Sequence, residues 1–309
     1  MKSAIVTGAN GFVGSNVVRE LLENGYSVCA IVRDGHRDHL PDAPELTVLS
    51  CGLEQMKDLP SLLPRAEGNL FYHFAWQGSA GSARADTALQ LQNAQWTVDA
   101  LRAANELGCR RFVGAGSIME RETMAAAYTQ GNRPGPGYIY GGGKVIAHIM
   151  CMSVAAELGM ELVWPEITNT YGVGEKSPRM VNTTIQKCIR GEAPQFTAGT
   201  QNYDFVYIDD VARAFRLIGE NGKPFHAHKY LIGSSTARPL RDFLTEMQDA
   251  IAPELPFLFG DIPFTGTDLP LSRFDCTETE RDTGFRAEIT FAEGCRRTME
   301  WWKKMEVTQ

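Results

Sequence analysis

The chain has 309 residues, of which 43% are hydrophobic and 22% charged, and its formal net charge is −7. This composition is ordinary for a globular protein, and the negative charge argues against nucleic acid or an anionic membrane as a partner. The seven cysteines are widely spaced and include no C-x-x-C pair, so we expect no metal site. Because we find neither a signal-peptide pattern nor an apolar run of membrane-spanning length, we expect a cytoplasmic protein.

Short apolar runs alternate with helical patterns through the first half of the chain. The runs predict strands at residues 3–7, 27–32, 46–49, 70–74, 111–114 and 161–164, and the periodic segments predict helices at 12–23, 85–107 and 138–158. Strands that alternate with helices form right-handed βαβ units, and continuous apolar runs are typical of parallel strands buried on both faces. The predicted fold is therefore α/β, with a Rossmann-type doubly wound parallel sheet.

After about Pro165 the pattern becomes irregular, and proline and glycine become frequent. We expect residues 1–165 to form a dinucleotide-binding domain and residues 166–309 a smaller mixed α/β substrate-binding lobe, with a last helix at about 291–304. The chain is expected to cross back into the first domain near residues 203–220. The lobe would cover the carboxyl edge of the sheet, where ligands of open α/β sheets bind.

A glycine-rich turn, TGANGFVG at residues 7–14, follows the first predicted strand. Gly8 permits a tight turn, Gly11 lets the backbone approach a pyrophosphate, and Gly14 allows the next helix to pack closely on the sheet. That helix would direct free N–H groups and its positive dipole end at the phosphates. Because the turn lies between a strand and a helix, it predicts a dinucleotide site rather than a turn without a ligand. The predicted cofactor contacts here are Gly8, Asn10, Gly11, Phe12, Val13 and Gly14.

The end of the second predicted strand bears on the choice between NAD and NADP. An acidic residue there would bind the ribose 2′-OH of NAD, whereas an arginine would accommodate the 2′-phosphate of NADP. Val32 stands at the acidic position, Arg33 follows it, and Arg37 is nearby. A planar guanidinium suits phosphate, so Arg33 and Arg37 favour NADP(H). The alternative is NAD(H). In that case Arg33 and Arg37 would be solvated loop residues, and the carboxylate of Asp34 would bind the ribose.

Tyr140 and Lys144 are four residues apart in a helical pattern, so they share one face of the helix. A free tyrosine has a pKa near 10, and a neighbouring ammonium and a cationic nicotinamide would lower that pKa towards neutrality. Lys144 could also hold the nicotinamide ribose. Ser117, which follows the strand at 111–114, offers a hydroxyl to bind a reacting carbonyl. The spacing of the pair alone is common on helix surfaces, but together with the serine and the dinucleotide turn it predicts a catalytic site.

With these residues the chain resembles the extended short-chain dehydrogenase/reductases, the NAD-dependent epimerase/dehydratase family, over nearly its whole length. The resemblance is carried by the opening turn and by three further segments, FYHFA at 71–75, NTYG at 169–172 and YDFVYIDDVA at 203–212. It implies a Ser-Tyr-Lys enzyme with a nicotinamide cofactor and a nucleotide-sugar substrate, which Asn169 would contact. The further cofactor contacts that it implies are Phe74, Ala75, Trp76, Lys144 and Ile167.

Family members form homodimers through two long helices, which correspond here to residues 85–107 and 138–158. The resemblance therefore implies a homodimer, with Val145, Ile149 and Met152 as candidate contacts, although these side chains could equally pack within the chain. It also implies that the partner of the site is a small nucleotide-sugar molecule.

Departures from the family pattern narrow the activity. Family dehydratases carry Asp and Glu directly after the active-site Ser or Thr, but Ile118 and Met119 stand there and cannot transfer a proton. A sugar 4,6-dehydratase is therefore disfavoured. Glu120 comes one residue later and is a candidate substrate contact, with a loop charge as the alternative. The three glycines at 141–143 are costly in a helix and would be explained either by close approach of cofactor or substrate or by a frayed helix start.

Tyr203 replaces the arginine that usually binds the diphosphate in this family. A tyrosine can stack or donate one hydrogen bond but cannot neutralise phosphate, so a standard UDP-sugar epimerase mode is in doubt. An aromatic residue there resembles the branch of nucleotide-sugar 4-ketoreductases. Tyr203 is a candidate substrate contact, and Arg179 or Lys176 could bind the phosphate.

Three functions follow from these residues. The favoured one is NADPH-dependent reduction of a nucleoside-diphosphate 4-keto-(deoxy)sugar, in which Ser117 binds the carbonyl, Tyr140 donates the proton and Lys144 tunes the tyrosine. The alternative is an NAD-dependent nucleotide-sugar 4-epimerase with the same residues. A non-catalytic dinucleotide-binding sensor is disfavoured because the tyrosine and the lysine are both present.

Overall fold

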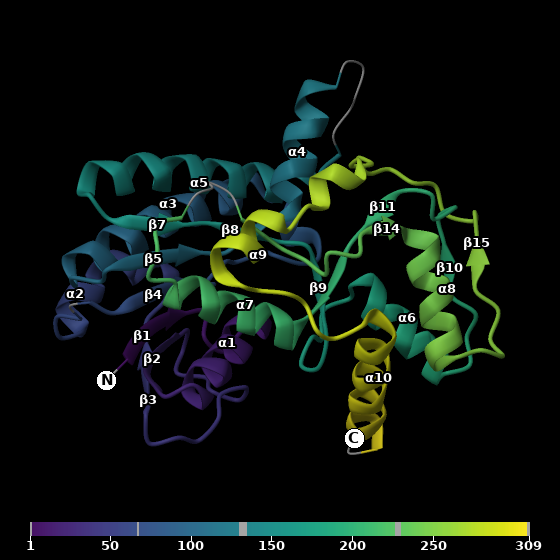
Figure 1. Cartoon of the computed structure of the whole chain (residues 1–309), viewed down its shortest axis with the longest axis horizontal. Helices are drawn as coiled ribbons and strands as arrows, with labels where there is room; N and C mark the ends of the chain where they lie inside the picture. Colours follow the sequence, from purple (N-terminus) through teal and green to yellow (C-terminus); the bar gives the residue numbers. More distant parts are fainter. Residues whose placement is uncertain (1, 67, 130–134, 226–229, 308–309) are drawn as a thin grey trace.

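A computed structural model of the chain describes residues 2–66, 68–129, 135–225 and 230–307 (Figure 1). Its central feature is a six-stranded parallel sheet in the order β3-β2-β1-β4-β5-β7. The strands are β1 Lys2–Thr7, β2 Tyr26–Val32, β3 Leu46–Ser50, β4 Leu70–His73, β5 Arg111–Gly114 and β7 Glu161–Val163. The strand order runs outward from β1 in both directions, and this confirms the predicted Rossmann-type doubly wound sheet.

Helices cover both faces of this sheet. On one face α3 (Thr87–Glu106) packs along α5 (Tyr138–Leu158), and on the other α1 (Phe12–Glu23) packs against α7 (Ile208–Glu220). The two apolar cores are separate, with Phe71 and Phe112 facing α3 and α5. The central strands β1, β4 and β5 are covered on both sides, so their side chains are almost all buried, as the continuous apolar runs predicted. The edge strand β3 has no fully buried side chain.

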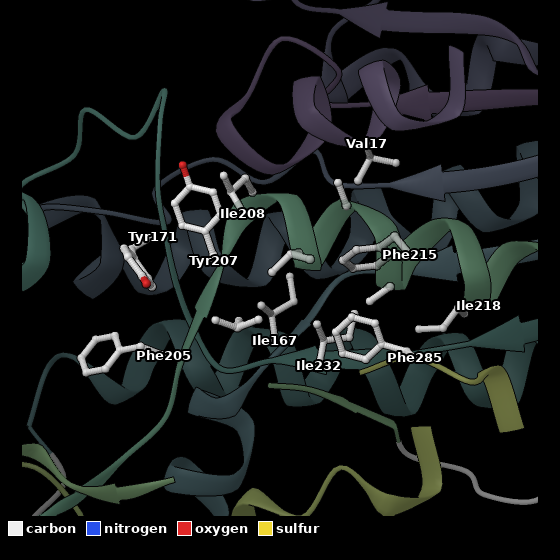
Figure 2. Packing of buried hydrophobic residues seen from close by; sticks show 14 of the residues in the cluster. Val17, Ile167, Tyr171, Phe205, Tyr207, Ile208, Phe215, Ile218, Ile232 and Phe285 are labelled. Carbon is white, nitrogen blue, oxygen red and sulfur yellow. The ribbon is translucent and has the colours of Figure 1, made fainter. Parts of the chain in front are cut away.

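The helix α7 comes from the second half of the chain but packs on the first half. Figure 2 shows Phe215 and Ile218 of α7 among Val17 of α1, Ile232 and Phe285. Within the segment predicted to cross back, residues 203–220, the helix α7 contacts α1 and β5 of the first half.

The rest of the second half is built from short strands and helices. Small strand groups pair β6 with β8 and β13, β9 with β12, β10 with β15, and β11 with β14. Their bounds are β6 Gly116–Ser117, β8 Pro165–Ile167, β9 Asn169–Tyr171, β10 Gln195–Phe196, β11 Asn202–Tyr203, β12 Phe205–Tyr207, β13 Tyr230–Ile232, β14 Arg238–Pro239 and β15 Leu258–Phe259. The helices are α6 Met180–Ile189, α8 Leu240–Ile251, α9 Thr277–Thr283 and α10 Phe291–Val307. In Figure 1, α6, α8 and α10 form a group beside the sheet domain.

The predicted strands and helices of the first half are all present, with ends that differ by one or two residues, and the last helix extends three residues further. The remaining short helices there are η1 Leu53–Asp58, α2 Leu59–Leu62 and η2 Ser82–Ala85. One longer helix was not predicted, α4 at Ile118–Tyr128. It begins at Ser117, whose side chain accepts from the backbone N of Met119, while the side chain of Glu120 accepts from the backbone N of Ser117.

The helix α5 is long and apolar enough to cross a membrane by length and composition alone. Its polar groups Tyr140 and Lys144 are buried in the fold, and 44% of the tested window lies inside the protein. A core helix of this kind meets the same criteria without entering a membrane, and the contacts of α5 with α3 and α4 are those of a core helix.

Candidate active site

A cavity of about 1000 Å³ runs along the carboxyl edge of the sheet. One end lies at the glycine turn and the end of β2, the middle lies beside Tyr140 and Lys144, and the other end lies at Asn169 and Arg179. This is the crevice in which open parallel sheets bind their ligands.

The glycine turn shapes the cofactor end through close backbone contacts. Gly8 has φ +66°, and a Cβ there would lie 2.6 Å from the backbone N of Ala75. A Cβ on Gly14 would lie 2.2 Å from the carbonyl O of Gly8. The N-cap residue of α1, Gly11, makes no side-chain capping bond, so the first N–H groups of α1 are available to an anion. The turn therefore fits a dinucleotide pyrophosphate.

The end of β2 separates the two predicted arginines. Arg33 lines the cavity with Val32, and its guanidinium pairs with the carboxylate of Asp34 at 3.3 Å. Arg37 is not among the lining residues, and it pairs instead with Asp42. The loop turns Arg37 outward, so only Arg33 is placed to meet a ribose phosphate. His36 and Asp38 also line the cavity, and the sequence patterns did not single them out.

The remaining predicted cofactor contacts lie along the cavity wall. Phe74, Ala75, Trp76 and Ile167 all line it. The indole N–H of Trp76 donates to Oε1 of Gln90 at 2.8 Å, which fixes the ring.

The three predicted catalytic side chains are brought to one part of the cavity by β6 and α5. Ser117, Tyr140 and Lys144 all line it. Because Oγ of Ser117 accepts from the backbone N of Met119 at 3.2 Å, its own proton is free to be donated. Nζ of Lys144 donates to the carbonyl O of Ala115 at 2.8 Å.

Burial is the largest influence on the pKa values of both Tyr140 and Lys144. Burial raises the pKa of Tyr140, and the cations that oppose this effect are Arg84 and Arg179. Burial also lowers the pKa of Lys144 to about 8, against the attraction of Glu120. The ammonium of Lys144 is directed at Ala115 and at the ring of Trp76, 3.8 Å from its centroid.

Glu120 lies beneath Ser117 rather than in the cavity. Its carboxylate accepts from the Ser117 backbone N at 2.9 Å and from Nε1 of Trp164 at 3.1 Å, and pairs with Nδ1 of His148 at 3.1 Å. The side chain is buried. Neither the substrate contact nor the loop charge describes this position, because the unpredicted helix α4 turns the carboxylate inward, where it holds the catalytic serine.

Donor atoms of Glu120, His148 and Glu166 lie within 4.8 Å of one another and are buried. Three such groups could bind a metal ion. Here, however, Arg121 pairs with Glu166 while His148 pairs with Glu120. The group therefore fits an internal polar network better than a metal site.

At the substrate end the cavity is lined by loop side chains. Asn169 and Arg179 line it as predicted, and Nε of Arg179 lies 3.6 Å from the carboxylate of Glu175. Tyr203 and Lys176 are not lining residues. Tyr203 stacks on Phe205 with ring centroids 5.6 Å apart, and burial raises its pKa to about 12. Because Tyr203 stacks on Phe205 and does not line the cavity, its position does not fit a substrate contact.

Arg84 is a cavity residue that the sequence patterns missed. Its guanidinium carbon is 4.4 Å from the centroid of the Tyr140 ring. No motif marks this residue. Its only signal is its place in a loop rich in small and polar residues, which follows a strand at the carboxyl edge of the sheet.

The glycines at 141–143 have a structural reason. A Cβ on Gly141 would lie 2.0 Å from Oγ1 of Thr123 in α4, and one on Gly143 would lie 3.0 Å from Cβ of Gln90 in α3. A Cβ on Gly142 would meet nothing within 4 Å. Two of the glycines therefore let neighbouring helices approach α5, so neither cofactor approach nor a frayed helix start explains them.

A doubly wound parallel sheet, a glycine turn at its first strand and a Ser-Tyr-Lys site at its carboxyl edge together define an NAD(P)-dependent enzyme of the short-chain dehydrogenase/reductase class. A sequence model of the NAD dependent epimerase/dehydratase family matches residues 4–233, and the chain belongs to this family. It is an oxidoreductase or epimerase of the extended type, and its cofactor is a nicotinamide dinucleotide.

Known relatives match almost the whole chain. It is 26% identical to a UDP-glucose 4-epimerase of Mycolicibacterium smegmatis, with 97% of this chain and 98% of the relative covered. It is 23% identical to a dTDP-glucose 4,6-dehydratase of Streptomyces antibioticus, with 97% and 92% covered. The crystal structure of the Bordetella bronchiseptica enzyme WbmF in complex with NAD+ has the same fold, with a TM-score of 0.79 at 20% identity over 99% of this chain and 94% of that one.

Proposed function

We propose that this protein reduces the 4-keto group of a nucleoside-diphosphate (deoxy)sugar with NADPH. The observation that carries the proposal is the composition of the cavity wall around Ser117. It offers a hydroxyl, a phenol and an ammonium, whereas Ile118 and Met119, which follow the serine, are apolar cavity residues. Such a wall can exchange a proton with a carbonyl or alcohol oxygen, but it lacks the adjacent acid pair with which family dehydratases eliminate water.

The geometry assigns a step to each side chain. A bound nicotinamide supplies the hydride. The Ser117 hydroxyl, oriented by the Met119 backbone N, donates a hydrogen bond to the keto oxygen. Tyr140 then donates its proton to the same oxygen, so the carbonyl becomes an alcohol and the phenol a phenolate. Lys144, buried and held by Ala115, is placed to bind the nicotinamide ribose.

The choice of NADPH rests on Arg33. It is an arginine in the cavity wall directly after Val32, where a 2′-phosphate would lie, and Asp34 is its ion-pair partner. WbmF, by contrast, is known in complex with NAD+. Steady-state kinetics with both cofactors test this part of the proposal. A tenfold preference for NADH would contradict it.

A nucleotide-sugar 4-epimerase is the second candidate, because the M. smegmatis relative carries that name and covers the whole chain. An epimerase takes a hydride from the sugar and returns it, so it keeps its cofactor bound. Purified protein that holds stoichiometric, non-exchanging NAD would favour the epimerase.

The test of the reductase is incubation of the purified protein with NADPH and a panel of 4-keto sugar nucleotides. We expect cofactor oxidation, measured as loss of absorbance at the nicotinamide band, with at least one of them. No oxidation with any member of the panel contradicts the proposal.

We also propose a homodimer through α3 and α5 in the cytoplasm. Ile149 and Met152 of α5 and Leu91 of α3 are exposed apolar side chains, at 58%, 44% and 56% exposure, and Val145 is half-buried.

All seven cysteines are free thiols, as suits a reducing compartment. Light scattering of the purified protein at micromolar concentration tests the dimer, and a monomer mass would contradict it.

A further inference from the structure

Arg84 lies against the face of the catalytic tyrosine, with its guanidinium carbon 4.4 Å from the ring centroid. Its Nη1 donates to the carbonyl O of Ser79 at 3.3 Å, and the side chain forms part of the cavity wall. Within the part of the chain that the structure describes, Arg84 has no carboxylate at ion-pair distance. Its charge is therefore directed at the Tyr140 ring and at the cavity.

The position of Arg84 is fixed by the fold. Gln90 of α3 is buried, and its Nε2 donates to the carbonyls of Gly78 at 3.1 Å and Ala83 at 3.0 Å. These two bonds hold both ends of the loop that leads into Arg84. Oε1 of the same glutamine accepts from Trp76, so one side chain positions the neighbours of Tyr140 on two sides.

Lys144 is engaged in a different direction. Its ammonium donates to Ala115 and lies 3.8 Å from the centroid of the Trp76 ring. That ring meets Tyr140 edge to face, with centroids 6.0 Å apart. The cation in direct contact with the Tyr140 ring is therefore Arg84.

Charged and titratable groups from several elements face this tyrosine. Besides Lys144 on its own helix, they are Arg84 of η2, Arg179 before α6, and Glu120 of α4 with the Ser117 hydroxyl. Burial has the largest effect and raises the pKa of Tyr140. The charges of Arg84 and Arg179 lower this pKa, and the charge of Glu120 raises it.

Glu122 of α4 faces Arg84 in turn. Burial raises the pKa of Glu122 to about 7, and Arg84 lowers it. Burial therefore favours the neutral form of this carboxyl, which opposes its pairing with Arg84.

We propose that Arg84 is a second cation that stabilises the phenolate of Tyr140 during proton transfer, in addition to Lys144. The inference rests on the proposed function, in which Tyr140 transfers the proton. When the Tyr140 O–H bond breaks, the proton forms the new O–H bond of the sugar alcohol, and the negative charge left on the phenol faces the guanidinium. In the reverse reaction the phenolate takes that proton back.

The test is a spectrophotometric titration of the phenolate in the complexes with NADP+ and with NAD+. For each protein, the spectrum of the same protein with the additional change Y140F is subtracted. The difference spectrum then reports the ionisation of Tyr140 alone among the nine tyrosines. R84M removes the charge but keeps an unbranched side chain, R84K keeps the charge, and R102M removes an exposed arginine of α3 as the control. We expect R84M to raise the pKa of Tyr140 by about one unit, R84K to raise it by much less, and R102M to leave it unchanged.

Turnover in the direction of alcohol oxidation supplies a second readout. In this direction Tyr140 must be ionised, so R84M should lower kcat about tenfold at neutral pH. At alkaline pH the kcat of R84M should return to the wild-type value. The acidic limb of the pH profile should shift upward by about one pH unit, as the pKa of Tyr140 does. A purely structural role would lower kcat at every pH without displacing that limb.

Equal titrations of Tyr140 in R84M and the wild type would overturn the inference, and so would a wild-type phenol that stays protonated in both complexes up to about pH 11. The titration contains no sugar. Failure of the sugar panel therefore contradicts the proposed function without touching this result, and failure of the titration leaves the panel result intact.

Discussion

The two ends of the cavity are built from different parts of the chain. At the cofactor end, the backbone sets the shape, because the turn at 7–14 brings Gly8 and Gly14 within contact distance of main-chain atoms. At the proposed substrate end, side chains of η2, β9 and the N-cap of α6 form the wall, namely Arg84, Asn169 and Arg179. At the cofactor end the approach of Gly14 to Gly8 is short-range, whereas the other end depends on side chains from segments far apart in sequence. The comparison explains why a family can keep one cofactor and change its substrate.

The largest effect is expected at the junction of the two ends. Y140F removes the proton donor but leaves a ring of nearly the same shape, and the glycine turn is untouched. We expect turnover to fall about 10³-fold while dinucleotide affinity stays within about twofold. Stopped-flow turnover and fluorescence titration of the cofactor measure the two quantities. An active Y140F would show that the phenol is not the acid–base group.

At the cofactor end, the addition of one methyl group in G14A should weaken dinucleotide binding. A Cβ on residue 14 would lie 2.2 Å from the carbonyl O of Gly8, so G14A must displace the turn. Overpacking of this kind costs about 1–3 kcal/mol, and a loss of this size in binding would weaken dinucleotide affinity by about fivefold to 150-fold. The control is G222A, where a Cβ meets nothing within 4 Å. Unchanged cofactor affinity in G14A would contradict the backbone-built site.

The glycines of α5 sharpen the comparison on the sugar side. G141A would collide with Thr123 of α4 and should lower the free energy of unfolding by about 1–3 kcal/mol. G142A meets open space in the same helix and should raise it by up to about 1 kcal/mol, since alanine is the better helix former. Denaturant titration measures both. Equal effects of the two changes would show that α4 does not approach α5 as described.

The smallest effect is expected at the ribose end. R33M removes the guanidinium that lines the cavity, whereas R37M removes one that points outward and pairs with Asp42. We expect R33M to lower the preference for NADPH over NADH about tenfold and R37M to leave the preference unchanged. The ratio of kcat/KM for the two cofactors measures it. A larger loss in R37M would reverse the assignment.

Much of the fold was predictable because local patterns and the final structure agree. The strand and glycine turn at 3–14 are adjacent in sequence, and Tyr140 and Lys144 are one helical turn apart. The helix α4 was missed although its start signal, Ser117 followed three residues later by Glu120, stands in the sequence. Ser117 also stands where family members carry an active-site residue, and Glu120 follows close behind it, so the sequence predicts a substrate contact for Glu120. The helix start turns this carboxylate inward instead.

The contacts of Arg84 were not predictable from the sequence. Its place beside Tyr140 depends on Gln90 holding the loop at Gly78 and Ala83. No periodicity or spacing relates these residues, because the relation exists only once α3 and α5 have packed. Tyr203 shows the converse, since a motif position predicted a substrate contact but the strand β11 directs the ring onto Phe205.

The most direct test of the central claim follows the hydride. The protein is incubated with a 4-keto sugar nucleotide and NADPH that carries deuterium at the transferable position, and the product is examined by NMR. Our account predicts deuterium at C4 of the sugar with the wild type and no reduced product with Y140F. A product that forms without deuterium at C4, or a sugar that is epimerised while NADPH is not consumed, would contradict it.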